Sequence, residues 1–287
     1  MYVNTKGIIL RETAYKDSSK ILTVLTGGEG KLTVAARGAL RKNSGNAAQT
    51  QLLAFSDMTI YRRGDRWTLT ESRSIEQFIG LRDDIGLLAL GAYFAELAEA
   101  VSDEDSPNPQ LLPLLLNALF ALSEKAQPPI IVKPVFEIRL MAISGFSPRI
   151  EACHICGAAE PPAALLDYCA GTFRCENCER TGHARADFAG ADNVRTTTTL
   201  PYPAETGNAR TATALPHAAG AGNARLGPGA LKAARFVIDC DLKKIFSFKL
   251  GGESLAELGR AAEGYLLTQL DRSFRTLDFY KGLSRAG

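Results

Sequence analysis

The sequence predicts an α+β multidomain protein in which an N-terminal OB-fold β-barrel precedes an α-helical domain with an inserted four-cysteine module. Short strands separated by glycine turns fill the first eighty residues. Apolar residues then recur at helical spacing, and four of the six cysteines stand in two Cys-x-x-Cys pairs. These patterns place the domains at residues 1–80, 81–150, 151–180, 181–228 and 229–287.

Five strand-like runs predict the barrel. The runs begin near Val3, Ile21, Lys31, Met58 and Trp67. The last two flank a turn rich in arginine. Short runs joined by glycine turns are typical of a small closed barrel such as an OB-fold. An SH3-like barrel would produce the same pattern, so that alternative stays open.

Helical patterns cover residues 81–150 and 229–287. From residue 90 to residue 101, apolar side chains recur every three or four positions. Residues 111–122 are apolar almost all round, which predicts a buried helix. A third helix is expected to end near Gly145.

The segment 181–228 differs in composition, because Ala, Thr, Gly and Asn dominate it and large apolar side chains are few. Residues 196–210 and 211–225 match at nine of fifteen positions and form a tandem repeat. So little apolar surface cannot offset the entropy of ordering the chain, so we expect an exposed, flexible insertion. Helical patterns return at 228–243 and 255–270.

The four paired cysteines predict a metal centre within residues 151–180. Two residues separate the members of each pair, and the eighteen residues between the pairs allow a hairpin to bring them together. Zinc prefers four thiolates in a tetrahedron, and protein groups would fill its whole shell, so the site is expected to be structural rather than catalytic. The predicted zinc ligands are Cys153, Cys156, Cys175 and Cys178.

Two alternatives to this four-thiolate zinc site remain open. The first is a pair of disulfides in a secreted protein, although the leftover Cys169 and Cys240 favour a reducing cytoplasm and no apolar run marks a secretory signal. The second is replacement of one thiolate by His154 or His183, which flank the cysteines. No stretch approaches the eighteen apolar residues of a membrane span, and no span is expected.

Charge is distributed unevenly, although the net charge is only +2. Residues 1–80 hold twelve Lys and Arg against seven Asp and Glu, whereas residues 81–106 hold one Arg against seven acids. A basic barrel indicates a polyanionic partner. A surface that is merely well solvated is the competing interpretation.

Two predicted loops concentrate the cations of the barrel. Guanidinium and ammonium groups neutralise phosphates, and flat aromatic rings stack on unpaired bases. The predicted nucleic-acid-binding residues are Lys31, Arg37, Arg41, Lys42, Arg62, Arg63, Arg66 and Trp67. The competing interpretations are that Trp67 belongs to the barrel core and that the arginines only solubilise an exposed hairpin.

No catalytic residues are predicted. Residues 27–31 resemble a phosphate-binding loop, but Leu25 and Leu32 occupy the positions where that loop needs glycine and Ser or Thr. The sequence contains neither a His-Glu-x-x-His helix nor a Gly-x-Ser-x-Gly elbow. Asp83 and Asp84 are interpreted as residues of a helix start rather than as metal ligands.

Taken in order, these segments resemble the bacterial RecO family of recombination mediators. The resemblance covers nearly the whole chain except residues 181–228, and it depends on segment order and on the position of the cysteine quartet. The segments that carry it are Gly7-Ile8-Ile9-Leu10-Arg11, Ile21-Leu22-Thr23-Val24-Leu25-Thr26, Gly30-Lys31-Leu32, Arg37-Gly38-Ala39, Gly145-Phe146-Ser147-Pro148 and Arg275-Thr276-Leu277-Asp278-Phe279. It implies an OB-fold, a helical domain, a zinc module and no enzymatic activity.

The resemblance also implies a function in DNA repair and recombination. Members of the family bind single- and double-stranded DNA, anneal complementary strands and contact the C-terminal tail of single-stranded-DNA-binding protein. With RecR they help load RecA onto coated strands. Arg37, Arg41 and Lys42 match the family's DNA-binding loop, whereas Lys31 and residues 62–67 extend the footprint on charge and geometry alone.

The expected location is the cytoplasm, in association with the nucleoid during repair. The main alternative function is a non-catalytic adaptor whose basic barrel binds an acidic protein partner rather than DNA. A nucleotide-dependent enzyme is a weaker alternative, because the phosphate-loop pattern is incomplete.

Overall fold

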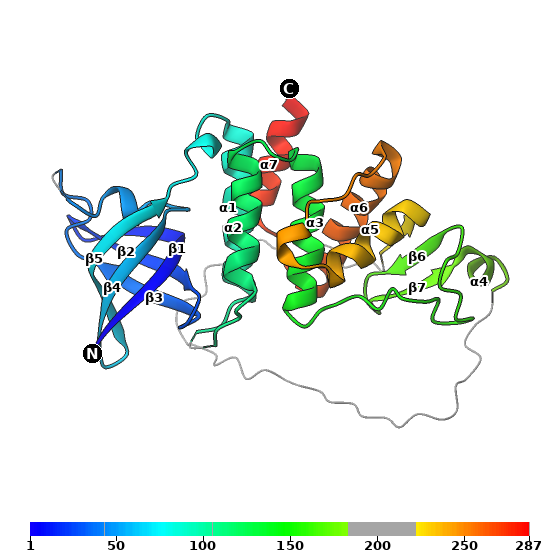
Figure 1. The fold of residues 1–287 in the computed structure, drawn as a ribbon, viewed down its shortest axis with the longest axis horizontal. Helices are drawn as coiled ribbons and strands as arrows, with labels where there is room; N and C mark the ends of the chain where they lie inside the picture. The colour runs from blue at the N-terminus through cyan, green and yellow to red at the C-terminus, as the bar shows by residue number, and fades with distance from the viewer. Residues whose placement is uncertain (43, 105, 183–221, 287) are drawn as a thin grey trace, which may run out of the picture.

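The computed structural model describes residues 1–42, 44–104, 106–182 and 222–286. A five-stranded barrel, a group of packed helices and a small three-stranded sheet follow one another along the long axis of the molecule (Figure 1). Most of the predicted repeat, residues 196–221, lies outside the described residues.

The barrel has the topology expected of an OB-fold. Its strands are β1 (Tyr2–Tyr15), β2 (Ser19–Thr26), β3 (Lys31–Ala36), β4 (Phe55–Arg63) and β5 (Arg66–Glu76). They close in the order β1-β2-β3-β5-β4, and β3 and β5 pair in parallel while the other neighbours are antiparallel. Alternate residues point inward, so that a compact apolar cluster including Ile9, Leu22 and Met58 fills the interior.

The helical domain has one continuous apolar core that extends into the small sheet. Its helices are α1 (Ile85–Val101), α2 (Leu111–Ser123), α3 (Pro129–Ile143), α5 (Pro228–Asp239), α6 (Gly252–Gln269) and α7 (Arg275–Ala286), with short 3-10 turns η2 (Ile79–Leu81) and η3 (Leu242–Lys244), whereas the 3-10 turn η1 (Ala48–Thr50) belongs to the barrel, between β3 and β4. The rings of Phe94 and Phe136 stack at 4.1 Å where α1 meets α3. The side chain of Asp84 accepts hydrogen bonds from the backbone of Gly86 and Leu87, which starts α1 as the acidic pair predicted.

One helix end and one additional helix differ from the expectation. Helix α5 ends at Asp239 rather than at 243, because the Asp241 side chain accepts from the Lys243 backbone N–H at 2.8 Å and begins the separate turn η3. The C-terminal segment forms α7, for which no helix was predicted, and it packs along α1 (Figure 1).

A cluster of charged side chains is buried between the helices. The Lys133 ammonium lies 2.8 Å from a carboxylate oxygen of Glu137 and 2.8 Å from one of Glu263, and the Tyr93 hydroxyl donates to Glu137 at 2.9 Å. Burial raises the pKa of Glu137, and the Lys133 charge only partly opposes it. Burial would lower the pKa of Lys133, but the two carboxylates raise it above its ordinary value. The cluster therefore links α3 to α6 through an ion pair and α3 to α1 through the hydrogen bond of Tyr93.

The barrel meets the helices through β1 and the start of β3. The Arg11 guanidinium lies 2.9 Å from the Glu99 carboxylate, and the Lys31 ammonium donates to the Glu99 carbonyl at 3.1 Å. A six-residue strand such as β3 spans about 20 Å. The loops at the opposite ends of β2 and β3 are therefore separated from the helical domain by roughly the length of the strands.

The small sheet joins chain segments from both sides of the predicted insertion. Its strands β6 (Ala164–Asp167), β7 (Thr172–Cys175) and β8 (Asn223–Leu226) lie in the order β7-β6-β8, and the short helix α4 (Glu176–Arg180) follows β7. The predicted end of the insertion at 228 is therefore wrong. Ala224 and Leu226 are buried while Asn223 and Arg225 are exposed, and this alternation makes residues 223–226 a strand.

Candidate nucleic-acid interface and metal centre

A groove of about 710 Å³ opens on the barrel where the β1–β2 turn, the end of β3 and the β4–β5 turn meet. Its lining includes Tyr15, Lys16, Lys20, Arg37, Arg41, Asp65, Arg66 and Trp67. The face formed by strands 2 and 3, with the loops between strands 1 and 2 and between strands 4 and 5, is the face on which OB-folds bind oligonucleotides. The groove lies on that face.

The exposed charges of the groove are mainly positive. Lys16, Arg37, Arg41 and Arg66 are exposed, and none of them forms an ion pair with any residue that the structure describes. Lys20, in contrast, is buried and paired with Glu12, and it also donates to the Thr50 carbonyl at 3.3 Å. Asp65 supplies the one carboxylate of the described lining. The groove therefore presents four cations whose charge is available to an anionic ligand.

Local backbone geometry holds the loop after β3 against the β1–β2 turn. Gly38 has a φ of +68°, and a Cβ at this position would lie 3.5 Å from Cδ of Arg41, so the Arg41 side chain packs directly over the glycine. The Leu40 backbone N–H donates to the Ser18 carbonyl at 3.0 Å, and the Gly38 N–H donates to the Ser19 hydroxyl at 3.4 Å. These bonds fix two of the groove loops in one unit.

Four of the eight residues predicted to bind nucleic acid line this groove, namely Arg37, Arg41, Arg66 and Trp67. Lys42 and Arg63 are exposed in the same two loops but do not line it. The Arg62 side chain turns back on its own hairpin, where its Nε donates to the Gly64 carbonyl at 3.1 Å.

Lys31 lies in a different place from the other predicted residues. It begins β3, whereas Arg37 follows the end of that strand, and it lines a second cavity of about 740 Å³ between the barrel and α1. Its ammonium is bonded to the Glu99 carbonyl there. The structure therefore does not group Lys31 with the groove, because the two ends of a strand face opposite ends of the barrel.

Trp67 belongs to the barrel core. Only 7% of its surface is exposed, and the Arg62 guanidinium lies 5.2 Å from the centroid of its ring. Trp67 therefore fits the interpretation of a core residue, and its buried indole cannot stack on a base.

The sequence prediction missed the β1–β2 turn. Tyr15, Lys16 and Ser18 line the groove, and Tyr15 is 49% exposed. The available signal was the aromatic–lysine pair Tyr15-Lys16 between the first two strand-like runs, combined with the OB-fold expectation that the loop between strands 1 and 2 flanks the ligand.

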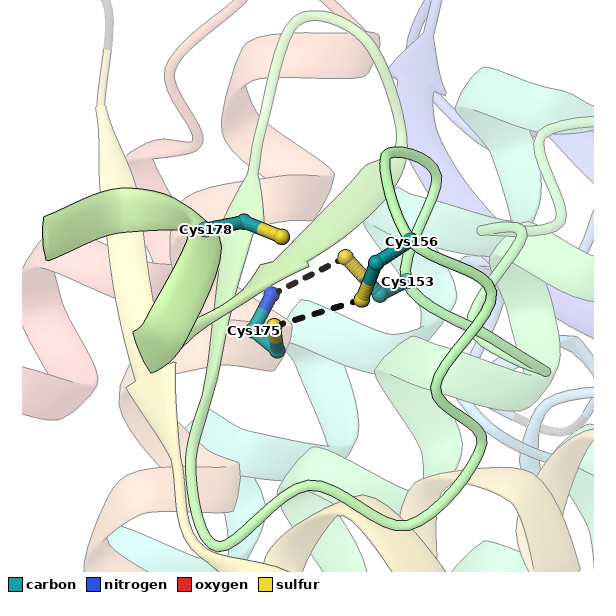
Figure 2. A group of neighbouring side chains, drawn as sticks. All are labelled: Cys153, Cys156, Cys175 and Cys178. Carbon is teal, nitrogen blue, oxygen red and sulfur yellow. Dashed lines mark hydrogen bonds between the residues drawn. The ribbon is translucent and has the colours of Figure 1, made fainter. Parts of the chain in front are cut away.

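The candidate metal centre contains all four of the predicted cysteine ligands. Their sulfur atoms all lie within 4.8 Å of one another, and the Cys156 and Cys175 sulfurs are 3.6 Å apart. Figure 2 shows all four side chains converging, two from a turn before β6, one from the end of β7 and one from α4. A tetrahedral ion with metal–sulfur bonds of about 2.3 Å separates its ligands by roughly 3.8 Å. The sulfur cluster matches the size and donor chemistry of a zinc site.

Backbone N–H groups surround the sulfur of Cys153. Burial opposes ionisation of Cys153, but N–H groups of Cys156, Cys175 and Ile155 lower the pKa of its thiol to about 6. The Cys175 N–H donates to the Cys153 sulfur at 3.3 Å (Figure 2). The first cysteine turn closes at Gly157, whose φ of +75° is the left-handed conformation that glycine adopts without strain.

The alternatives to a four-thiolate site fit the geometry less well. All six cysteines are free thiols in the structure, and the 3.6 Å separation of Cys156 and Cys175 exceeds a disulfide bond length of about 2.05 Å. Nδ1 of His154 lies 2.9 Å from the Phe173 carbonyl oxygen, and His154 does not belong to the sulfur cluster. His183 lies outside the described residues.

Two family models match successive parts of the chain. The family model "Recombination protein O N terminal" matches residues 1–78, and "Recombination protein O C terminal" matches residues 82–191. DNA repair protein RecO of Caldicellulosiruptor bescii is 33% identical over 62% of this chain and 72% of its own length. The chain belongs to the RecO family. RecO of Bacillus pumilus is 34% identical over 62% of the chain and 69% of its own length. RecO of Acetivibrio thermocellus is 27% identical over 99% of the chain and 98% of its own length.

Membership of the RecO family places the chain among proteins of DNA repair and recombination. The two family models meet between residues 78 and 82, which is the connection between the barrel and α1. Among the described residues, no helix is both long and apolar enough to cross a membrane.

Proposed function

We propose that this RecO-family protein is a non-catalytic recombination mediator that binds and anneals DNA strands through the barrel groove. The observation that carries the proposal is the set of four exposed, unpaired cations on the oligonucleotide-binding face of an OB-fold. Several exposed cations in one groove can neutralise several phosphates of a single strand, and each neutralised phosphate releases counterions.

Annealing follows from the same electrostatics. Two complementary strands repel each other through their phosphates, and this repulsion slows their encounter. A cationic groove that holds one strand lowers the negative potential met by the second. The bases then pair without any bond being made or broken by the protein, so the proposed function needs no catalytic residue.

The proposed resident metal is one structural zinc ion held by Cys153, Cys156, Cys175 and Cys178. When bound, zinc would supply a cross-link between the cysteine turn, β7 and α4. The support comes from the sulfur geometry and from the burial of Cys153 and Cys175 in the core shared with the helices. Arg235 of α5 reinforces this attachment, because its guanidinium donates to the carbonyls of Ile150, Glu151 and Ala159 at 2.6–2.8 Å.

The proposed partners are single- and double-stranded DNA, RecR, the C-terminal tail of single-stranded-DNA-binding protein, and RecA as the recombinase that is loaded. The family resemblance is the only support for the protein partners, whereas DNA binding is also supported by the groove. An acidic protein tail is the alternative occupant of the groove, since it carries the same sign of charge as DNA.

Equilibrium binding separates these two occupants. A fluorescein-labelled single strand of twenty nucleotides and a labelled acidic peptide of similar charge would be titrated with the purified protein at low salt. We expect binding of the strand, and acceleration of the pairing of two complementary strands under the same conditions. Tight binding of the peptide together with no binding of the strand would refute the proposal and support the adaptor.

A further inference from the structure

The groove holds one exposed aromatic side chain that its charges do not explain. Tyr15 ends β1, is 49% exposed and lines the groove together with Arg37, Arg41 and Arg66. The other aromatic residue of the lining, Trp67, is 7% exposed. An aromatic ring left open to solvent beside phosphate-binding cations is the arrangement with which single-strand-binding OB-folds stack bases.

The backbone that carries Tyr15 is well fixed. Tyr15 pairs with Ser19 at the last position of the β1–β2 ladder, so the ring projects from a strand rather than from a loose loop. The Leu40 N–H bond to the Ser18 carbonyl ties this turn to the loop that carries Arg37 and Arg41. The ring and the guanidinium groups therefore belong to one connected unit, and their spacing does not depend on a flexible linker.

The next residue adds a cation directly to the ring. Lys16 has a φ of +55°, which folds the chain sharply after Tyr15, and its ammonium lies 5.3 Å from the centroid of the tyrosine ring. A cation at this distance is attracted to the face of the ring. About half of the Tyr15 surface stays open to solvent, so the ring is accessible to a base, and the Lys16 ammonium beside it is available to a phosphate.

We propose that Tyr15 is a base-stacking residue of the groove and that it makes the protein prefer unpaired over paired DNA. The proposal rests on the function proposed above and adds to it the source of strand selectivity. In a duplex, both faces of every internal base are covered by its neighbours, so the ring contributes nothing to duplex binding. A single strand exposes its bases, and one stacked base strengthens binding by about tenfold.

Three probes distinguish stacking from charge. They are a labelled twenty-nucleotide thymidine strand, a strand of the same length with abasic sites throughout, and a twenty-base-pair duplex. We expect Tyr15→Ala to weaken binding of the thymidine strand by about tenfold and to leave the other two probes within about twofold. Tyr15→Phe should retain the wild-type affinities, because the ring and not the hydroxyl makes the contact.

The matched control is Tyr2→Ala. Tyr2 is 66% exposed, lies outside the groove lining and contacts the Tyr61 ring at 4.8 Å, so its loss should leave all three affinities unchanged. Equal weakening of all three probes by Tyr15→Ala, or no weakening of any, would overturn the stacking proposal while leaving DNA binding intact. Failure of the wild-type protein to bind even the abasic and duplex probes would overturn the proposed function and this inference with it.

Discussion

Removal of two groove charges gives the sharpest quantitative prediction. The double substitution Arg37→Gln and Arg41→Gln keeps two polar, uncharged side chains and removes half of the four unpaired cations. Both residues are exposed, so the barrel should fold as before. The single-strand affinity should fall, and its dependence on salt should become shallower, because fewer counterions are released on binding.

The expected magnitude follows from the number of cations. For single strands, the slope of log K against log salt is about −0.7 per neutralised phosphate, so four contacts give a slope of about −3. Between 50 and 200 mM salt, wild-type affinity should therefore fall by about 50-fold. With two contacts the slope is about −1.4, and the fall over the same range is about sevenfold.

Fluorescence anisotropy of a labelled single strand across a salt series measures both slopes. The control is Lys6→Gln with Arg73→Gln, since both side chains are exposed on the barrel, lie outside the groove lining, and remove the same charge. The control should keep a slope near the wild-type value. If both double variants reduce the slope of log K against log salt equally, the slope depends on overall charge and the groove is not the binding surface.

Three further predictions concern the metal centre, the buried charges and the barrel core. Cys175→Ser should lose most of its bound zinc and unfold at a lower temperature, because one thiolate ligand is removed. Metal analysis by mass spectrometry measures the zinc content, and an unsubstituted protein that contains no zinc would contradict the prediction. Lys133→Met should cost about 3–5 kcal/mol of unfolding free energy at pH 8, since the buried Glu137 loses its ion-pair partner, whereas Glu263 keeps Lys281. The loss of unfolding free energy relative to the wild type should become smaller toward pH 5, because Glu137 in the folded variant has a pKa above its unfolded value and takes up a proton. Denaturant titrations in which this loss does not change with pH would contradict the prediction. Trp67→Phe should change single-strand affinity by less than about twofold, because the indole packs inside the barrel, and a tenfold loss in a folded variant would show that the ring contacts DNA.

The sequence predicted those features that depend on local spacing. Two Cys-x-x-Cys turns specify ligand positions within a few residues, and the structure brings all four sulfurs together. Alternation in short runs predicted the strands of the barrel, and the arginines that follow β3 line the groove. Such features need no knowledge of how distant segments pack.

The features that the sequence did not predict depend on long-range packing. Lys31 lies near Arg37 in sequence, but a strand places them at opposite ends of the barrel. Strand β8 pairs with β6, although residues 183–221 lie between the two strands in sequence. The local pattern of a four-residue strand does not indicate which strand it pairs with. The burial of Trp67 follows from its alternation with Leu69 on the inner face of β5, a two-residue pattern too short to decide between the core and a binding surface.

Hydrogen exchange of the wild-type protein with and without a single strand shows where DNA binds, because it locates the contact without any substitution. We expect slower amide exchange in residues 15–20, 37–42 and 63–68 when a twenty-nucleotide strand is bound at low salt, with little change in α3 and α6. Protection confined to the helices, or none at all under conditions where the strand is bound, would contradict the assignment of the groove as the DNA-binding surface.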